Sequence, residues 1–341
     1  MPNKEYLTSS YNFTLPKELI ATNPVSPRDS AKLLVYNRQT DEITHVLFSD
    51  FEKFIPKNCA LIFNDTKVIK ARLLGLKNSG GKIELLINRA LNAHDINVYI
   101  RGKVKVDTKI FFDETLMVKV KELNTDGSRI VNFFSDEKLL RFEEILPIID
   151  KIGHVPLPPY IQREDNKSDE SEYQSVFAQN EGAVAAPTAS LHFTTKQHKR
   201  VCKNYKHAYV TLHVGSGTFK PVECENITEH PMHSEYYDIS NSAKELLDSD
   251  IKILSIGTTS TRTIEFYARH HKQKGEANLF LHPNNKPLRV NHLLTNFHLP
   301  KSTLLMLVAS FVGVDKAQEL YKVAIENRYR FYSYGDAMLI L

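Results

Sequence analysis

The sequence has no tryptophan and only three cysteines in 341 residues, namely Cys59, Cys202 and Cys224. Because the cysteines are odd in number and far apart, their spacing fits neither a zinc knuckle nor a redox pair. Free thiols are typical of a reducing compartment, so we expect a cytoplasmic protein.

Long hydrophobic runs are also missing. The first twenty residues contain no basic region followed by an apolar run, so they do not predict a secretion signal. The most apolar window, TLLMLVASFVGV, is about a dozen residues long, whereas a helix that crosses a bilayer needs ~20. We therefore expect no membrane partner.

Charge of one sign is not in large excess. The net charge of +4 and the pI near 8.7 permit a nucleic-acid partner without requiring one. A length of 341 residues, 42% of them hydrophobic, indicates two domains that each bury a core.

The two predicted domains differ in their hydrophobic pattern. From Lys67 to Asp136, apolar residues alternate with lysine and arginine, which predicts a half-exposed antiparallel sheet and a small barrel. The segment 162–174 is predicted to be a mobile polar loop. Beyond Gly182, strands such as ANLFLH (277–282) alternate with helical stretches. We predict an α/β catalytic domain (1–66 and 151–341) with crossover helices and an inserted antiparallel β-barrel domain (67–150).

Histidine is concentrated in the α/β part, since eleven of the fourteen lie between His192 and His298. The stretch TEHPMHSEYYDIS (228–240) places His230 and His233 between two glutamates. Pro231 prevents the two histidines from sharing an uninterrupted helix, as those of H-E-x-x-H do, and no third ligand is close. The pattern favours acid/base work over zinc. A metallohydrolase that also uses distant histidines stays open, as does a non-catalytic protein that binds nucleic acid.

Three further stretches carry candidate binding groups. The loop HVGSGTF (213–219) has glycines that let backbone amides approach a ligand, although a plain turn explains it equally well. SIGTTSTRT (255–263) runs from a strand into hydroxyl residues at a helix start, which suits an anion or a simple cap. LLTNFHLPKSTLLML (293–307) has more hydrogen-bonding groups than a cap requires.

Nine blocks in order resemble one family, the S-adenosylmethionine:tRNA ribosyltransferase-isomerases that form epoxyqueuosine. They are NDTKVIKARL, VPLPPYI, YQSVFA, GAVAAPTASLHF, VTLHVGSGTFKPV, EHPMHSEYY, IGTTSTRT, LLTNFHLPKSTLLMLVASF and YRFYSYGDAMLI. Departures are Ser190, where the family usually has glycine, and Asn284 and Asn291, where a glycine and an acid are usual.

The resemblance implies an α/β domain with an inserted barrel and a reaction without metal or redox cofactor. The ribosyl part of S-adenosylmethionine would be transferred and isomerised onto 7-aminomethyl-7-deazaguanine at the wobble position of tRNA, with release of adenine and methionine. The methionine carboxylate would suit the helix start at 258–262, and adenine would lie near 215–219. Aromatic faces would surround the sulfonium. We expect a monomer.

The candidate residues combine the motifs with this resemblance. For proton transfer they are His192, His213, Glu229, His230, His233 and Glu235. For substrate binding they are Asn64, Asp65, Thr188, Phe193, Gly215, Gly217, Phe219, Thr258, Thr259, Ser260, Arg262, Asn296, His298 and Lys301. For tRNA phosphates they are Arg28, Lys67, Arg72, Arg101 and Lys103, which could equally be a solvated face of the sheet.

Overall fold

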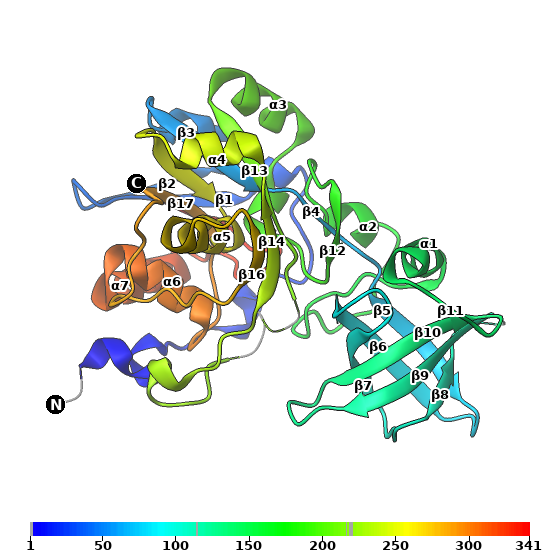
Figure 1. The fold of residues 1–341 in the computed structure, drawn as a ribbon. Coiled ribbons are helices and arrows are strands. Elements are labelled where there is room, and N and C mark those ends of the chain that lie inside the picture. The colour runs from blue at the N-terminus through cyan, green and yellow to red at the C-terminus, as the bar shows by residue number, and fades with distance from the viewer. Residues whose placement is uncertain (1–2, 114, 216, 218–220) are drawn as a thin grey trace.

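The chain forms a large mixed sheet with helices on both faces and a separate β-barrel beside it (Figure 1). The computed structural model describes residues 3–113, 115–215, 217 and 221–341. Within them the large sheet has nine strands, in the order β16 (Lys274–Ala277), β14 (Glu235–Ile239), β13 (His207–Leu212), β3 (Cys59–Asn64), β15 (Lys252–Ile256), β17 (His292–Asn296), β18 (Ala337–Ile340), β1 (Lys32–Asn37) and β2 (Glu42–Leu47).

The middle of this sheet is apolar on both faces. All six residues of β3 are buried, and it pairs in parallel with β13 and β15. Alternate residues of β3 enter different cores, since Leu61 and Phe63 belong to one cluster and Ala60 and Ile62 to another. A strand covered on both faces needs such a continuous apolar run, which explains the sequence CALIF.

Helices cover both faces of the sheet. They are α3 (Thr195–Asn204), α4 (Asn241–Leu247), α5 (Thr258–His270), α6 (Thr303–Val312) and α7 (Val314–Glu326). Short 3₁₀ turns are η1 (Lys4–Tyr6), η2 (Thr8–Tyr11), η3 (Lys17–Leu19), η4 (Arg28–Ser30), η5 (Phe48–Phe54), η6 (Thr188–His192) and η8 (Ile227–Glu229). Hydroxyl caps begin three of the helices, because Thr194, Ser240 and Ser302 each accept a hydrogen bond from a first-turn amide.

The barrel is antiparallel and closed. Its strands are β5 (Arg72–Lys77), β6 (Lys82–Ala90), β7 (Ile96–Arg101), β8 (Lys109–Phe111), β9 (Leu116–Leu123) and β10 (Arg129–Ser135), with β11 (Lys138–Leu139) at one edge. Pairing of β10 with β9 closes the ring around a core of its own. The predicted fold class, α/β with an inserted antiparallel barrel, is confirmed.

Two connections join the barrel to the sheet. β4 (Thr66–Val68) continues from β3 and pairs in parallel with β12 (Asn180–Ala183). After the barrel, α1 (Phe142–Ile152) leads to a segment whose His154 exchanges backbone hydrogen bonds with Arg72 at the root of β5. The chain then passes α2 (Asp169–Glu172) and returns to the sheet.

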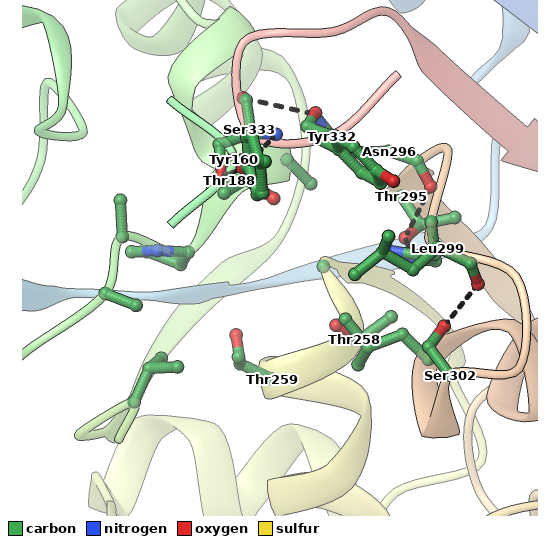
Figure 2. A pocket seen from close by; sticks show the side chains of 18 residues that line it. Tyr160, Thr188, Thr258, Thr259, Thr295, Asn296, Leu299, Ser302, Tyr332 and Ser333 are labelled. Carbon is green, nitrogen blue, oxygen red and sulfur yellow. Dashed lines mark hydrogen bonds between the residues drawn. The ribbon is translucent and has the colours of Figure 1, made fainter. Parts of the chain in front are cut away.

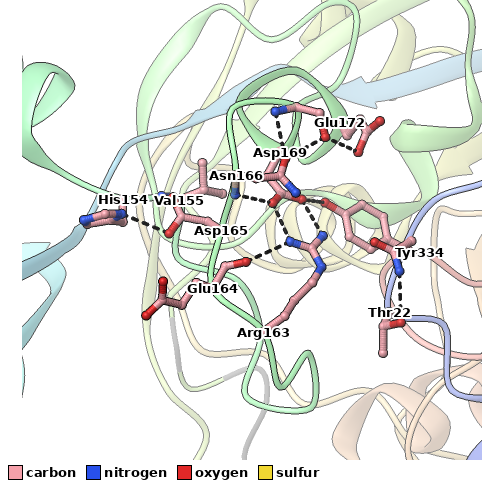
Figure 3. Close-up of polar contacts among 12 residues, drawn as sticks. Thr22, His154, Val155, Arg163, Glu164, Asp165, Asn166, Asp169, Glu172 and Tyr334 are labelled. Atoms are coloured by element: carbon pink, nitrogen blue, oxygen red, sulfur yellow. Dashed lines mark hydrogen bonds and ion pairs between the residues drawn. The ribbon is translucent and has the colours of Figure 1, made fainter.

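The segment 162–174, expected to be a mobile polar loop, is anchored by buried contacts. Arg163 forms a two-pronged ion pair with the fully buried carboxylate of Asp169, and the Tyr334 hydroxyl donates to the same carboxylate at 3.0 Å (Figure 3). Nearby, Asp165 accepts from Val155 N at 2.9 Å and lies 3.0 Å from His154 Nδ1. Its polar composition therefore serves an internal network.

The predicted strand 277–282 is wrong in position. β16 ends at Ala277, because only Lys274–Ala277 pairs with β14. The residues that follow turn away, with Asn285 donating through its side chain to Phe280 O at 2.7 Å and Leu281 entering the main core. Apolar residues at 279–281 thus serve loop packing, which resembles a strand in composition.

Candidate active site

A first cavity, here called the sheet cavity, opens at the carboxyl ends of the central strands (Figure 2). Figure 2 shows Tyr160, Tyr332 and Ser333 on one side and Thr258, Thr259 and Ser302 on the other. Its lining residues are Tyr160, Ala185, Ala186, Pro187, Thr188, Ala189, Val214, Gly257, Thr258, Thr259, Thr295, Asn296, His298, Leu299, Ser302, Leu304, Tyr332 and Ser333. Among these described lining residues there are many hydroxyls and one titratable imidazole, that of His298, but no carboxylate, lysine or arginine.

The start of α5 forms one wall of the sheet cavity. Gly257, before the helix, has φ +95° and ψ 157°, a conformation that only glycine adopts without strain. Thr258 and Thr259 follow it, and Asn64 at the end of β3 donates to Thr259 Oγ1 at 3.1 Å. Gly257, Thr258 and Thr259 all line the cavity, so the start of this thirteen-residue helix lies on its wall, a position that suits an anionic group.

The opposite wall of the sheet cavity is fixed by buried hydrogen bonds. Asn296 Nδ2 donates to Tyr332 O at 2.9 Å, while its Oδ1 lies 3.3 Å from His192 Nε2. His298 Nε2 lies 2.8 Å from Thr295 Oγ1. Burial lowers the pKa of His192 to about 4 and that of His298 to about 3, so both imidazoles are neutral at pH 7.

Two tyrosines complete this wall. The Tyr160 and Tyr332 rings lie with their centroids 4.4 Å apart, and Ser333 N donates to the Tyr160 hydroxyl at 2.9 Å. Both tyrosines and Ser333 were missed as site residues, although VPLPPYI and YRFYSYGDAM were recognised as motifs. These residues line the sheet cavity because the loop that carries YRFYSYGDAM packs against the proline segment VPLPPYI, and the sequence alone does not show this contact.

A second cavity, here called the junction cavity, lies between the sheet and the barrel. The barrel and α1 contribute Asn88, Arg89, Ala90, Leu91, Asn97, Tyr99, Asp126 and Phe142. The α/β part contributes Glu181, Gly182, His213, Gly215, Gly217, His233, Ser234, Glu235, Tyr236 and Glu276. The structure therefore brings together His213, His233 and Glu235 of the predicted acid/base set.

His213 is held between two neighbours. Its ring stacks on Tyr236 with centroids 5.9 Å apart, and a Cβ on Gly182 would lie 2.9 Å from the same ring. Its Nδ1 shares a hydrogen bond of 2.8 Å with Thr66 Oγ1. Burial lowers the pKa of His213, and the charge of Asp65 partly opposes this shift. A neutral imidazole in a fixed orientation can accept a proton.

Glu235 links the loop after β13 to helix α5. Its carboxylate accepts from Gly215 N at 2.9 Å and forms an ion pair with Arg262. Both side chains are buried, with 5% and 7% of their surface exposed. Arg262 is therefore engaged by Glu235 and does not line the sheet cavity, whereas Thr258 and Thr259 of the same predicted helix-start site do.

Close packing explains why residue 217, in the segment after β13, is a glycine. A Cβ on Gly217 would lie 2.4 Å from His233 Cδ2, which is inside the contact distance of real atoms. His230 lies outside the junction cavity, edge-on to Phe280 with centroids 6.0 Å apart. Burial and the neighbouring His233 both lower the pKa of His230.

Several predicted residues do not reach either cavity. Phe193 and Ser260 are completely buried in the core, Phe193 among aromatic rings and Ser260 donating to Ile256 O at 2.9 Å. Glu229 and Lys301 are exposed in turns. Phe193, Ser260 and Lys301, predicted to bind substrate, and Glu229, predicted for proton transfer, thus line neither cavity. Phe219 lies outside the described residues.

Asp65 faces another cleft, where it accepts from Thr211 Oγ1 at 2.6 Å. His192 likewise lines a small cleft beside Arg28, apart from His213 and His233. The four histidines of the metallohydrolase alternative are thus divided between sites. Among the residues that the structure describes, no group of three His, Cys, Asp or Glu side chains could hold a metal ion.

The predicted tRNA contacts separate into engaged and exposed cations. Arg28 donates to Gln174 O at 2.8 Å and to Ser171 O, and Arg72 pairs with Glu84 at 2.9 Å. Lys67 pairs with Glu181 at 2.7 Å. Arg101 is 88% exposed, with Glu84 at 4.0 Å, and Lys103 is also exposed. Arg28, Lys67 and Arg72 are therefore engaged within the protein, whereas Arg101 and Lys103 are exposed. The tRNA contacts stay a prediction.

Two of the positions at which the sequence departs from the family pattern can be located in the structure. Asn291 Oδ1 accepts from Ile253 N at 2.9 Å, a role that an acid could also fill. Ser190 is fully buried, and its hydroxyl has no hydrogen-bond partner within the described residues. In the same residues, no helix is long and apolar enough to cross a membrane.

The α/β sheet with its inserted barrel thus carries two cavities that are lined by neighbouring residues after β13, with Val214 in the sheet cavity and His213 and Gly215 in the junction cavity. The chain belongs to the queuosine biosynthesis protein family, whose profile matches residues 8–340. It is 78% identical over 342 residues, and 100% of both chains, to the S-adenosylmethionine:tRNA ribosyltransferase-isomerase of Sulfurimonas denitrificans.

Other relatives agree. A protein of the same name from Campylobacter fetus is 58% identical over 98% of each chain. The crystal structure of S-adenosylmethionine tRNA ribosyltransferase from Thermotoga maritima is 32% identical, with a TM-score of 0.54, and the match covers 97% of this chain and 100% of that one. The family resemblance deduced from the nine sequence blocks is confirmed.

Proposed function

We propose that the chain transfers and isomerises the ribosyl moiety of S-adenosylmethionine onto 7-aminomethyl-7-deazaguanine at the wobble position of tRNA, releasing adenine and methionine. One observation carries the proposal. Val214 lines the sheet cavity, whereas its neighbours His213 and Gly215 line the junction cavity. A donor in one cavity and an acceptor base in the other would meet at a single loop, as a group transfer requires.

S-adenosylmethionine is assigned to the sheet cavity. The first amides of α5, with Thr258 and Thr259, would bind its carboxylate. The ring faces of Tyr160 and Tyr332 would lie beside the sulfonium, since a cation is attracted to aromatic faces. Neutral His192 and His298 add no repelling positive charge at neutral pH. This places the donor away from the loop 215–219 that we first assigned to adenine.

Proton transfer is assigned to the junction cavity. The reaction needs a base that removes the proton next to sulfur, and His213 combines a neutral imidazole with a fixed ring. Glu235 fixes the loop by holding Gly215 N and Arg262, so it acts as a positioning residue. His233 would contact the deazaguanine base from the same wall of the junction cavity.

The partner is tRNA that carries the aminomethyl deazaguanine. A wobble base is unpaired in the free anticodon loop, so it can be splayed out into a cavity between two folded units. We also propose a metal-free reaction and a cytoplasmic monomer. The three cysteines, all free thiols in the structure, fit a reducing compartment.

Release of adenine tests the proposed function directly. The protein is incubated with S-adenosylmethionine and tRNA bearing the deazaguanine precursor, and free adenine is measured by chromatography. We expect adenine and methionine in equal amounts, with none from tRNA that carries guanine at the same position. If the protein binds both tRNA and S-adenosylmethionine but releases no adenine, that result would contradict catalysis and support a binding protein instead.

A further inference from the structure

The outer face of the barrel carries a third hollow, here called the barrel groove, with a volume of about 970 Å³. Three large apolar side chains that line it, Leu74, Leu76 and Phe111, are exposed. Single exposed apolar residues are common, but a contiguous group of them marks a surface that binds a partner. The volume lies within the ~300–1,000 Å³ of sites for small ligands, so the groove can hold a unit of about that size.

The strand register places the side chains of the groove in two neighbouring rows. In one row Phe111 of β8, Leu76 of β5 and Lys82 of β6 lie opposite one another. In the next row Leu74 of β5 is separated from Arg101 of β7 by one position of β6. Residues two apart on a strand share a face, so both rows lie on the outside of the barrel. The groove therefore has an apolar half on β5 and β8 and a cationic half on β6 and β7.

The cations of the barrel groove are available to a charged ligand. Arg101 is exposed, and its nearest carboxylate oxygen in the described residues, on Glu84, is 4.0 Å away. Lys82 and the neighbouring Lys103 are exposed and form no ion pair within the residues that the structure describes. The stretch 101–109 contains four lysines and arginines against one aspartate. The rim of the groove thus carries an excess of positive charge.

The two carboxylates of the groove are already engaged. Glu84 accepts from Arg72 Nε at 2.9 Å, and Asp113 accepts from Thr115 N at 2.8 Å. These contacts offset the negative charges, so the complement of the groove is an anionic partner. A nucleotide combines a phosphate with an apolar base face, and proteins bind single-stranded RNA with just such pairs of cationic and aromatic surface.

The barrel groove and the junction cavity share two strands. Tyr99 of β7 lines the junction cavity, and Arg101, two residues further along the same strand, lines the groove. This separation is ~7 Å along a strand. On β6, an extra residue at Asn88 forms a β-bulge against β7 at the cavity end, and Glu84 lies at the groove end. An RNA strand with one base in the junction cavity therefore has its next nucleotide near the groove.

We propose that the barrel groove binds an unpaired nucleotide of the anticodon loop that neighbours the wobble base, with its base on Leu74, Leu76 and Phe111 and its phosphate on Arg101. The inference rests on the proposed function, which puts the wobble base in the junction cavity. Apolar side chains do not distinguish the edges of bases, so the groove adds affinity for loop RNA with little sequence preference. Two contacts on one strand also restrict the orientation of the loop.

The absence of tryptophan from the sequence allows the groove to be tested by fluorescence. Phe111→Trp keeps a stacking face and places a single tryptophan in the groove. We expect tRNA that carries the aminomethyl base to quench the emission of this variant. The emission of Leu288→Trp should stay constant, because Leu288 is an exposed residue of the α/β part that lines neither cavity nor the groove.

Synthetic anticodon stem–loops identify the bound nucleotide. Each contains one abasic nucleotide, placed on one or the other side of the wobble position. We expect the quenching of Phe111→Trp to be lost with one of the two stem–loops and kept with the other, since only one neighbour of the wobble base faces the groove.

Affinities separate the base contact from the phosphate contact. Phe111→Ala should raise the Kd of tRNA about 5–100-fold, the loss of stacking with one base, and leave the slope of log affinity against log salt unchanged. Arg101→Gln should reduce that slope by about one. Leu288→Ala is the matched control and should bind tRNA as the wild type does. Denaturant unfolding checks that each variant is folded.

Each result bears on one claim. Binding of tRNA without quenching of Phe111→Trp would overturn the inference and leave the groove to a protein partner. Wild-type affinity of Phe111→Ala for tRNA would overturn it as well, as would quenching that persists with both abasic stem–loops. Absence of adenine release by the wild type would contradict the proposed function, whereas the fluorescence and the Kd values are measured without turnover and still test the groove.

Discussion

At the scale of single residues, the titration of His213 is set by two opposing influences. Burial lowers the pKa of its imidazole, and the nearby Asp65 carboxylate raises it by a smaller amount. The net pKa lies below the ordinary 6.5, so the ring is neutral and able to accept a proton at pH 7. Asp65 contributes although its own side chain opens to a different cleft.

Asp65→Asn should shift the acid limb of the pH–rate profile. A base must be neutral to act, so kcat/KM falls as the pH falls through the pKa of His213. Without the Asp65 charge that pKa drops further, and the limb should move to lower pH. The measurement is kcat/KM for adenine release between about pH 5 and 8, the range in which histidine titrates. Asp238→Asn, which alters another carboxylate of the same cleft, should leave the limb in place. A limb that moves upward, or not at all, would remove His213 from the role of base.

At the scale of elements, two helices begin in the same way but in different places. Gly257 precedes α5 with φ +95°, and Gly313 precedes α7 with φ +82°. Only the first lies on the wall of the sheet cavity. Substitutions at these two glycines can therefore be compared to separate the cost of backbone strain from the effect on ligand binding.

Gly257→Ala should lower stability and weaken S-adenosylmethionine binding, whereas Gly313→Ala should lower stability alone. Each alanine is forced into a conformation that costs about 1–3 kcal/mol. At position 257 relief of that strain also displaces Thr258 and Thr259, so the KM for S-adenosylmethionine should rise several-fold. Denaturant unfolding and steady-state kinetics measure the two effects. Equal KM values for the two variants would show that the start of α5 does not bind the donor.

Most elements of the α/β part could be predicted because their apolar period is long. Strands alternating with helical stretches were predicted beyond Gly182, and the structure has helices there at Thr258–His270 and Val314–Glu326. The strand prediction at 277–282 was wrong because apolar loop residues that fill a core have the composition of a strand. The bulge at Asn88 has no local signal, since it depends on the register of two strands.

Only part of the candidate site could be predicted from the sequence motifs. His213, His233 and Glu235 meet in one cavity, as their motifs suggested. His192 and Phe193 carry the same kind of motif but pack into the interior, since residue type does not say which face of a turn is covered. The barrel residues Asn88 and Asn97 were missed because polar positions on barrel strands suggested a solvated face.

At the scale of the whole molecule, the barrel supplies one wall of the junction cavity and much of the positive charge. Residues 67–141 contain fifteen lysines and arginines against nine aspartates and glutamates. Across the cavity, Arg89 of β6 forms an ion pair with Glu276 of β16 at 3.0 Å. The domain bounds at 66/67 and 150/151 stay a prediction.

Arg101→Glu and Lys103→Glu should weaken tRNA binding, because these cations project from the barrel with little internal engagement. A cation that neutralises one phosphate releases counterions, so each variant should reduce the slope of log affinity against log salt by about one. Adenine release at saturating tRNA should be unchanged, since neither residue lines a candidate cavity. The matched control is Lys322→Glu on α7, an exposed cation of the α/β part. Filter binding at several salt concentrations measures the slopes. If the barrel variants and the control have the same slope, phosphates do not contact this face and tRNA approaches from another side.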